Sequence, residues 1–503
     1  MLTTLAAPAF ADIWHIENGD ITISAGESGN NVTQNNNTTY GDTNTIITNQ
    51  NKDTASSHTV TIEAKDKDDK VEVTLKDVNI DTSSRNKAAV SVTGEGDTNI
   101  KLDGDNALKS DIYRSGIYGS GSGSLTISGG ENDSLTAQGG SGANGISSSG
   151  SLTISGGTVT ANGDDGGRGI SSSGSVTISG GSTVTANGGS GTISGGDGIW
   201  SGGGVTISGG STVTANGGNG GSLVGGDGIR SGGGLTVSDG TVTAKGGNGD
   251  SKDGYGGDGI RSGGVVTISG NTVNAAGGYG GKVGGYGICS FDRVAISGGT
   301  VEAAGGNGST GGGSGIYSSV IDLSGSLELT AKAGSPTGKA LLQNGRELDL
   351  DTIKDKLGPG AKVTATDANG ETKEVSIPRP VEPEEPVIPE ESSSSSDGGS
   401  ATPSAPVSPL PGLTVTDRDG QRISYTSTQS GNTLTVCVGR LTASFRISLA
   451  ALRQLRAEGI ETITFQTILC STTLSVDELL AMGGEDAEAV LTHRFTDSSL
   501  TVG

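Results

Sequence analysis

Apolar and polar residues alternate in short segments that recur at near-regular intervals through the middle of the chain. One segment, of the type Leu-Thr-Ile-Ser, occurs eight times, and successive copies start 24 to 31 residues apart. A glycine turn and a second segment of the type Thr-Val-Thr-Ala follow, and a glycine-rich loop of variable length then leads to a closing Gly-Ile. The copies begin at Leu125, Leu152, Val176, Val205, Leu235, Val266, Val294 and Ile321. This periodicity is typical of a repeat architecture.

Each unit contains three short segments of period two and no helical periodicity, which predicts three β-strands per coil. Alternation places the aliphatic residues of these strands inside and the Thr and Ser residues outside. Stacked coils of this kind form a parallel β-helix, an all-β solenoid whose thin core needs only small aliphatic side chains. Glycine is expected at the corners, where the backbone needs a positive φ or a close approach, and in the variable loops.

The solenoid is expected to span residues 12–345, with the repeat clearest over 98–325. Less regular alternating segments begin at Ile21, Val60, Val71, Ala88 and Asn99, and polar loops such as residues 30–39 separate them. We expect these coils also to cap the N-terminal end. Residues 346–377 are expected to close the other end, with a helical stretch near 350–357 and a hairpin turning at Asn369-Gly370.

Residues 378–412 have the composition of an extended linker, because nine of the twelve prolines lie there together with glutamates and five consecutive serines. Residues 413–503 differ in composition. Strands are predicted from Leu413, Ile423, Leu434 and Phe445, a helix from Ser448 to Gly459, and a second helix after the capping box Ser475–Glu478. This pattern predicts a small C-terminal α+β domain.

Composition and charge narrow the functional classes. Of the 503 residues, 92 are glycine and only 3% are aromatic, which argues against a conventional enzyme with one thick core. The net charge of −23, with no basic stripe, argues against a nucleic-acid partner. Three cysteines are too few for a disulfide scaffold, although Cys437 and Cys470 fall in the same small domain and could pair.

Residues 1–11 resemble the end of a secretory signal peptide. They are apolar and finish with Ala9-Phe10-Ala11, the pattern of a cleavage site; the alternative is an ordinary apolar N-terminus. The chain contains no run of about 18 apolar residues, so no membrane span is expected. We therefore expect an extracellular or cell-surface protein.

Several segments resemble a family of secreted clostridial carbohydrate-binding β-helix proteins of Gram-positive bacteria. The resemblance covers roughly residues 60–345. It lies in Lys87-Ala-Ala-Val-Ser-Val92, in Asn99-Ile-Lys-Leu-Asp-Gly-Asp-Asn-Ala-Leu-Lys-Ser110, in Ser115-Gly-Ile-Tyr118 and in the repeated Leu-Thr-Ile-Ser-Gly-Gly and Thr-Val-Thr-Ala-Asn-Gly-Gly units. The resemblance implies a non-catalytic protein that binds cellulose or pectic polysaccharides with bound calcium.

Stacking turns equivalent positions of successive units into columns with a rung of about 4.8 Å. Three adjacent coils carry Asp197, Asp227 and Asp258 before Gly-Ile, and Trp200, Arg230 and Arg261 after it. Stacked carboxylates repel one another unless something compensates. In a structural interpretation, Arg230 and Arg261 neutralise Asp227 and Asp258. In a functional one, Trp200 stacks on a sugar, the Asp/Arg pairs bind hydroxyls or uronate carboxylates, and the three aspartates hold Ca²⁺.

Tyrosines extend this candidate carbohydrate site. Tyr255, Tyr279 and Tyr286 lie in glycine-rich loops, where few side chains are available to cover them. Exposed aromatic rings suit the faces of sugars, whereas the structural alternative is packing against the solenoid wall. The aromatic and polar columns together predict a polysaccharide partner, either a plant cell-wall polymer or a host glycan.

Other functions fit parts of the sequence. The main alternative is an adhesin or stalk whose binding activity lies in residues 413–503. The Thr-x-Thr triplets from Thr158 to Thr243 form an outward array of the kind found in ice-binding solenoids, but the array lapses at Asn274. Catalysis is not expected, because the nearest acid–base cluster, Asp164-Asp165 with Arg168, has no histidine near it in sequence.

Overall fold

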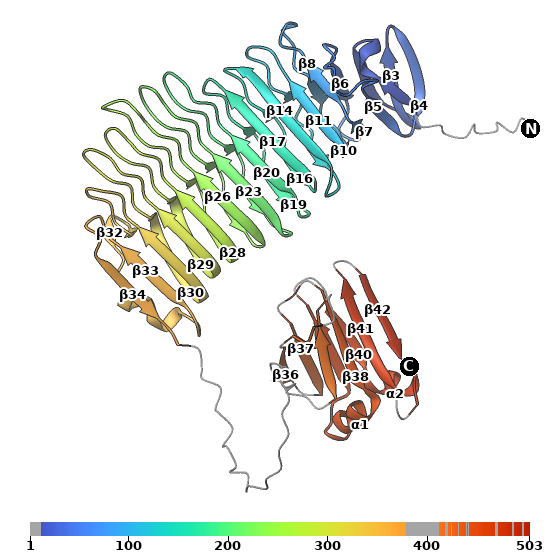
Figure 1. The fold of residues 1–503 in the computed structure, drawn as a ribbon, viewed down its shortest axis with the longest axis vertical. Coiled ribbons are helices and arrows are strands. Elements are labelled where there is room, and N and C mark those ends of the chain that lie inside the picture. The colour runs from blue at the N-terminus through green and yellow to red at the C-terminus, as the bar shows by residue number, and fades with distance from the viewer. Residues whose placement is uncertain are drawn as a thin grey trace, which may run out of the picture. The chain divides into compact units, whose positions relative to one another are not determined.

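The computed structural model describes residues 12–378, 412–417, 421–423, 425–430, 432–438, 440, 442–467, 471–484, 487–494 and 497–502. They belong to two compact units, one within residues 1–384 and one within 385–503. The first unit is a parallel β-solenoid of about 14 turns, which confirms the fold class predicted from the repeat (Figure 1). The signal-like residues 1–11, most of the expected linker (379–411) and Cys470 lie outside the described residues.

Each regular coil contributes three strands that pair in parallel with the same strands of the next coil. The first strands are β10 (Asp97–Asp103), β13 (Leu125–Ser128), β16 (Leu152–Ser155), β19 (Val176–Ser179), β22 (Val205–Ile207) and β25 (Leu235–Val237). The second strands are β11 (Asp105–Lys109), β14 (Ser134–Ser141), β17 (Thr158–Asp164), β20 (Thr183–Asn187), β23 (Ser211–Asn216) and β26 (Gly240–Lys245). The third strands are β12 (Ile117–Gly119), β15 (Ile146–Ser148), β18 (Ile170–Ser172), β21 (Ile199–Ser201), β24 (Ile229–Ser231) and β27 (Ile260–Ser262). In the last coils these segments merge into β28 (Val266–Ala276), β29 (Ile288–Ala304) and β30 (Ile316–Lys332).

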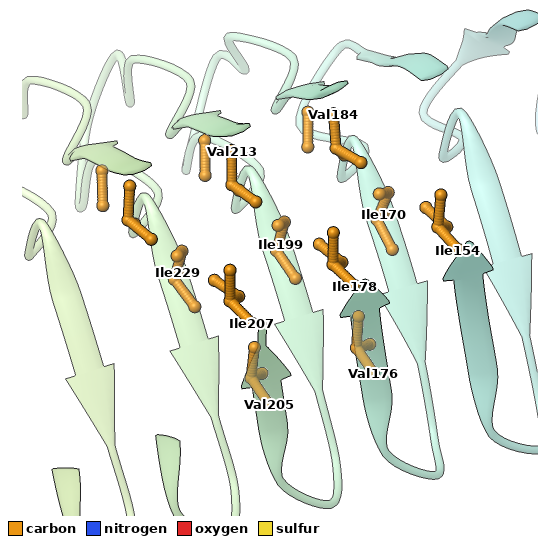
Figure 2. Packing of buried hydrophobic residues seen from close by; sticks show 14 of the residues in the cluster. Ile154, Ile170, Val176, Ile178, Val184, Ile199, Val205, Ile207, Val213 and Ile229 are labelled. Carbon is orange, nitrogen blue, oxygen red and sulfur yellow. The ribbon is translucent and has the colours of Figure 1, made fainter. Parts of the chain in front are cut away.

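The core consists of aliphatic columns, one side chain per coil. Val184 pairs in register with Val213, and Ile199 with Ile229, and all of these side chains are buried. Figure 2 shows the same residue types recurring at the same places from coil to coil. Each coil thus buries little apolar area of its own and depends on its neighbours for the rest, which explains how so few apolar residues suffice.

The prediction that all serines point outward is wrong for the third strand. The serine two residues after the closing isoleucine is buried, as in Ser201 and Ser231. The Ser201 hydroxyl donates to the carbonyl of Gly174 in the preceding coil (2.9 Å), and that of Ser231 to Gly203 (3.0 Å). Burial of this hydroxyl is tolerated because it donates to a backbone carbonyl in each of the six coils from Ser172 to Ser318.

The glycine-rich loops are a regular stacked structure along one side of the solenoid (Figure 1). Gly196 donates its N–H to Gly189, Gly218 to Gly196 and Gly226 to Gly218, and this zigzag continues to later coils. A Cβ added at Gly226 would lie 1.9 Å from the oxygen of Gly196, so this column requires glycine for close backbone approach. Positive φ is instead needed at the turn between the first and second strands, for example at Gly210 (+72°).

The N-terminal end of the solenoid is closed by an antiparallel hairpin that was not predicted from the sequence. Residues expected to form a polar loop make an antiparallel hairpin, β3 (Gly29–Gln34) and β4 (Asn37–Asp42), which pairs with β2 (Ile21–Gly26). The side chains of Asn30 and Gln34 are buried and donate to backbone carbonyls. These polar residues therefore belong to an ordered hairpin at the N-terminal end of the solenoid and not to a solvated loop. The other elements here are β1 (Ile13–His15), the 3₁₀ turn η1 (Ile16–Asn18), β5 (Thr45–Thr48), β6 (Val60–Ala64), β7 (Lys70–Lys76), β8 (Asn79–Asp81) and β9 (Val90–Gly94).

The C-terminal cap of the solenoid agrees with the prediction. Its elements are β31 (Leu341–Gln343), β32 (Arg346–Glu347), the 3₁₀ helix η2 (Leu350–Lys356), β33 (Lys362–Thr366) and β34 (Thr372–Ser376). β33 and β34 form the expected antiparallel hairpin around Asn369-Gly370, and β33 continues the parallel stack on β30. Leu350 and Ile353 of η2 are buried, which covers the last coil.

The described residues of the second unit form two four-stranded sheets and two short helices. One sheet contains β35 (Leu413–Thr416), β38 (Ala443–Ser448), β41 (Glu488–Arg494) and β42 (Asp497–Val502). The other contains β36 (Thr426–Ser430), β37 (Thr433–Cys437), β39 (Thr462–Gln466) and β40 (Ser471–Ser475). Ser448 caps α1 (Leu449–Ala457) and Ser475 caps α2 (Val476–Ala481), as predicted. The strand expected at Ile423 is instead β36, a few residues later, and the thiol of Cys437 donates to Gln466.

Candidate functional site

A groove of about 720 Å³ crosses the coils of the solenoid that carry Asp197, Asp227 and Asp258. It follows the line along which the returning arm of each glycine-rich loop meets the third strand. In each coil the groove is lined first by a loop residue and then by the residue before Gly-Ile; in the coil of Asp227 these are Val224 and Asp227, followed by Arg230. The loop residues Ser194, Val224, Tyr255 and Val283 are aligned by parallel bridges between coils.

The three aspartates have a structural task that sequence reasoning missed. The Oδ1 atom of each accepts a hydrogen bond from the backbone N–H at the same position of the next coil, so their column stitches the loop arms together. The donors are Asp227 (2.9 Å), Asp258 (2.7 Å) and Tyr286 (2.7 Å), in that order. Asn144 accepts the same bond from the N–H of Arg168 (2.8 Å). Because a neutral amide performs this task at Asn144, the task does not explain why the next coils carry carboxylates.

The second oxygens of these carboxylates differ in their partners. Oδ2 of Asp197 accepts a hydrogen bond from Nε of Arg168 (3.2 Å), and Oδ2 of Asp258 accepts one from Nη1 of Arg261 (3.3 Å). Asp227 lies between them and has no ion pair within 4.0 Å among the described residues. The guanidinium of Arg230, which is exposed, likewise has none in this part of the chain. The expected neutralisation of Asp258 by Arg261 is present, whereas the expected Asp227–Arg230 pair does not form.

Burial and like charge perturb the titration of this column. Asp227 is only 6% exposed, and its burial, followed by the charges of Asp258 and Asp197, raises the pKa of its carboxyl well above the usual range. Burial also raises the pKa of Asp258, to about 6, although hydrogen bonds from Tyr286 and Arg261 oppose the shift. Perturbed carboxyl groups that line a groove are typical of functional sites, although ion-pair networks also produce them.

Trp200 does not offer the open stacking face that the sequence suggested. The guanidinium of Arg168 lies over the indole, 4.3 Å from the ring centroid, while its Nε is bonded to Asp197. The side chain of Arg168 therefore covers Trp200 and lines the groove, whose lining continues on the N-terminal side to Asn144 and Gly142. From the sequence, Arg168 was considered only beside Asp164 and Asp165; its contact with Trp200 was missed, although it occupies the same column as the aspartates.

The three candidate tyrosines occupy different positions. Tyr255 lines the groove and is 43% exposed, with the ammonium of Lys282 at 5.6 Å from its ring. Tyr286 stacks on Tyr317 of the next coil (5.1 Å, 17°) and bounds the groove on the C-terminal side. Tyr279 is exposed but does not line the groove. The structure thus brings Tyr255 and Tyr286 to the aspartate column and leaves Tyr279 outside.

The aspartate column does not fit a calcium ion. Each carboxylate already uses Oδ1 on a backbone N–H, and two of the three use Oδ2 on an arginine. Calcium prefers six to eight oxygen ligands gathered around one point. Throughout the described ranges, no group of three or more His, Cys, Asp or Glu side chains is placed to hold a metal ion.

The other candidate residues do not assemble into a second site. The carboxylate of Asp164 accepts a hydrogen bond from the backbone N–H of Asp165. The side chain of Arg168 instead donates to Asp197. The Thr-x-Thr residues are aligned between coils, as Thr212 with Thr241, on the outer face of the second strands. Within the part of the chain that the structure describes, no helix is long and apolar enough to cross a bilayer.

Comparisons with known proteins add no relative from which a function could be carried over. The chain matches no protein-family model, and no curated protein or solved structure is significantly similar to it.

Proposed function

We propose that this chain is an exported, non-catalytic polysaccharide-binding protein and that its groove is the binding site. The observation that carries the proposal is the unpaired Arg230 and Asp227 in the middle of an open groove. Paired charges would complete a structural ladder, as they do in the neighbouring coils. Unpaired ones leave hydrogen-bonding capacity for a ligand.

The lining has the chemistry that sugars require. Carboxyl and guanidinium groups bind hydroxyls, and an arginine also binds a uronate carboxylate through two parallel hydrogen bonds. The exposed ring of Tyr255 supplies an apolar face against which a sugar ring can stack. In this proposal binding needs no calcium, and the arginines serve acidic sugars directly.

Retention of the full chain on insoluble cellulose, pectin and mucin, with and without a chelator, tests the proposal. We expect retention on at least one of these polymers, unaffected by the chelator. Arg230→Ala should lower the affinity of the protein for that polymer about tenfold, because a charge-assisted hydrogen bond contributes about 1.5 kcal/mol or more. Arg293→Ala is the matched control, since Arg293 is also exposed, pairs with Asp322 and lies outside the groove lining.

Each result has a distinct meaning. Retention on none of the polymers overturns the proposal and leaves the stalk alternative, in which residues 413–503 provide the binding activity. Retention that survives Arg230→Ala unchanged keeps the function but excludes the groove as its site. Retention that the chelator abolishes contradicts the calcium-independent mechanism.

A further inference from the structure

One edge of the groove and its middle repeat at the same spacing. Along one edge, Ser194, Val224, Tyr255 and Val283 follow one another at the spacing of bridged parallel strands, about 4.8 Å. Along its middle, the residues before Gly-Ile are joined from coil to coil by the side-chain hydrogen bonds described above. A ligand that makes comparable contacts at each coil must itself repeat at about one unit per coil.

The ends of the repeating part are defined by side chains. Upstream, the groove lining continues to Asn144, but its loop residues there are Gly166 and Gly142, which have no side chain to form an edge, and Arg168 crosses to Asp197 and Trp200. Downstream, Tyr286 stacks on Tyr317, and the loop column continues at Gly311, which has no side chain to form an edge. Four coils therefore have a side chain on the loop edge of the groove, namely Ser194, Val224, Tyr255 and Val283.

An extended peptide does not match this site. Peptides that bind along a sheet use unpaired backbone N–H and C=O groups. Here the backbone N–H groups of Asp227, Asp258 and Tyr286 are already bonded to the aspartate column. An extended peptide also advances about 3.3 Å per residue, and about 6.6 Å between side chains on the same face, neither of which is in step with the coils.

An unbranched chain of pyranose rings does match, because each ring advances the polymer by close to one coil. We propose that the groove holds a straight segment of polysaccharide along the solenoid axis, one sugar residue per coil, and that four residues fill it. The coil of Val224, Asp227 and Arg230 is then the subsite with the most free polar groups, and the coil of Tyr255 is the subsite where a ring stacks. This inference rests on the proposed function and adds the length and shape of the ligand.

Titration calorimetry of the full chain with oligogalacturonides and cello-oligosaccharides of two to eight residues tests it. In the series that binds, the affinity should rise by at least about tenfold from two to four residues. From four to eight residues it should change less than about twofold, after correction for the number of four-residue windows in each ligand.

Three tryptophan variants locate the ligand on the groove. Ser194→Trp fills the first subsite, so the affinity should level off at three residues. Val224→Trp obstructs the middle, so four residues should bind no better than two. Leu223→Trp is the matched control: Leu223 is the exposed neighbour of Val224 but does not line the groove, and this variant should bind like the parent. Circular dichroism and thermal melting check that each variant keeps the fold.

The inference fails if affinity does not depend on length, or if Val224→Trp and Leu223→Trp behave alike. It also fails if the protein is retained on an insoluble polymer but binds no oligosaccharide of two to eight residues. These results leave the retention experiment standing, so failure of the inference is distinguishable from failure of the proposed function.

Discussion

The coils around residues 70–110 and those around residues 195–290 share one fold but arrange charge in opposite ways. In the first, opposite charges face each other from coil to coil, as in Lys76–Asp103 (2.7 Å) and Lys109–Asp81 (3.0 Å). In the second, Asp197, Asp227 and Asp258 stack directly on one another. Sign alternation is what a solenoid wall favours, because cross-strand pairs of like charge are destabilising. The departure from it coincides with the groove, where local strain is typical of a functional site.

The two regions therefore respond to pH in opposite directions. Partial burial alone would raise the pKa of Asp20, in the N-terminal coils, but hydrogen bonds from Arg85 and Lys87 outweigh it and lower the pKa far below its usual range. The stability from Asp20 is present in full above the ordinary pKa of about 3.9 and is lost progressively as the pH falls from there through the much lower pKa of the folded state. The pKa of Asp258 is raised to about 6, so the destabilisation that this group causes is absent well below the ordinary pKa of about 3.9, grows between about pH 4 and pH 6, and is fully present above that range.

The largest expected effect concerns the glycine stack, which supports the groove coils. Gly226→Ala should lower the free energy of unfolding by about 3 kcal/mol, because its Cβ would overlap the carbonyl oxygen of Gly196 and the backbone must move. Gly210→Ala, which has open space but a positive φ, should cost only about 1 kcal/mol. Urea unfolding of the two variants measures the difference. Equal costs would show that the loops repack freely and that the stack is not rigid.

The second effect concerns the charged coils. Asp20→Ala removes hydrogen bonds to His58 (3.1 Å), Arg85 (2.7 Å) and Lys87 (3.0 Å). Since the carboxylate is about one-third exposed and water screens part of the attraction, we expect a loss of about 1–2 kcal/mol at pH 7. Thermal melting at pH 7 and pH 3 should show a smaller loss at pH 3, where the carboxyl is largely protonated in the unfolded chain but still ionised in the folded one. The exposed Asp68→Ala is the control and should change neither value.

The core columns and the charge columns could be predicted from the sequence, whereas much of their environment could not. Alternation within each strand decides which side chains enter the core, so Val184 and Ile199 were assignable from the repeat. The buried Ser201 was missed because its partner is a backbone carbonyl of another coil, which no periodicity displays. The contact of Arg168 with Trp200 was missed because a long arginine side chain can reach several residues of the adjacent coil, and the sequence does not show which of them it contacts.

The third effect reverses the usual sign of a substitution. Asp227→Asn should stabilise the protein by about 1 kcal/mol at pH 8 and have a smaller effect at pH 4, because the raised pKa favours the neutral carboxyl there. The amide keeps an oxygen that accepts the N–H of Asp258, as Asn144 does for Arg168. Thermal melting at the two pH values measures this. Destabilisation at pH 8 would contradict a strained aspartate column. Asp250→Asn, in an exposed loop, serves as the control.

The smallest effect tests whether the alternating charges of the first region are only a solvated surface. Lys101 and Glu72 lie 2.6 Å apart on adjacent coils, and each side chain is about half exposed. A double-mutant cycle with Lys101→Ala and Glu72→Ala should give a coupling of a few tenths of a kcal/mol, because exposed pairs gain little over their hydration. The coupling should disappear in 1 M salt, where screening acts within about 3 Å. A coupling above about 1 kcal/mol that survives salt would mean that these ladders help to set the register of the coils. In that case the two regions would differ in how charges are arranged from coil to coil, but in both regions the charged side chains would help to hold the coils in register.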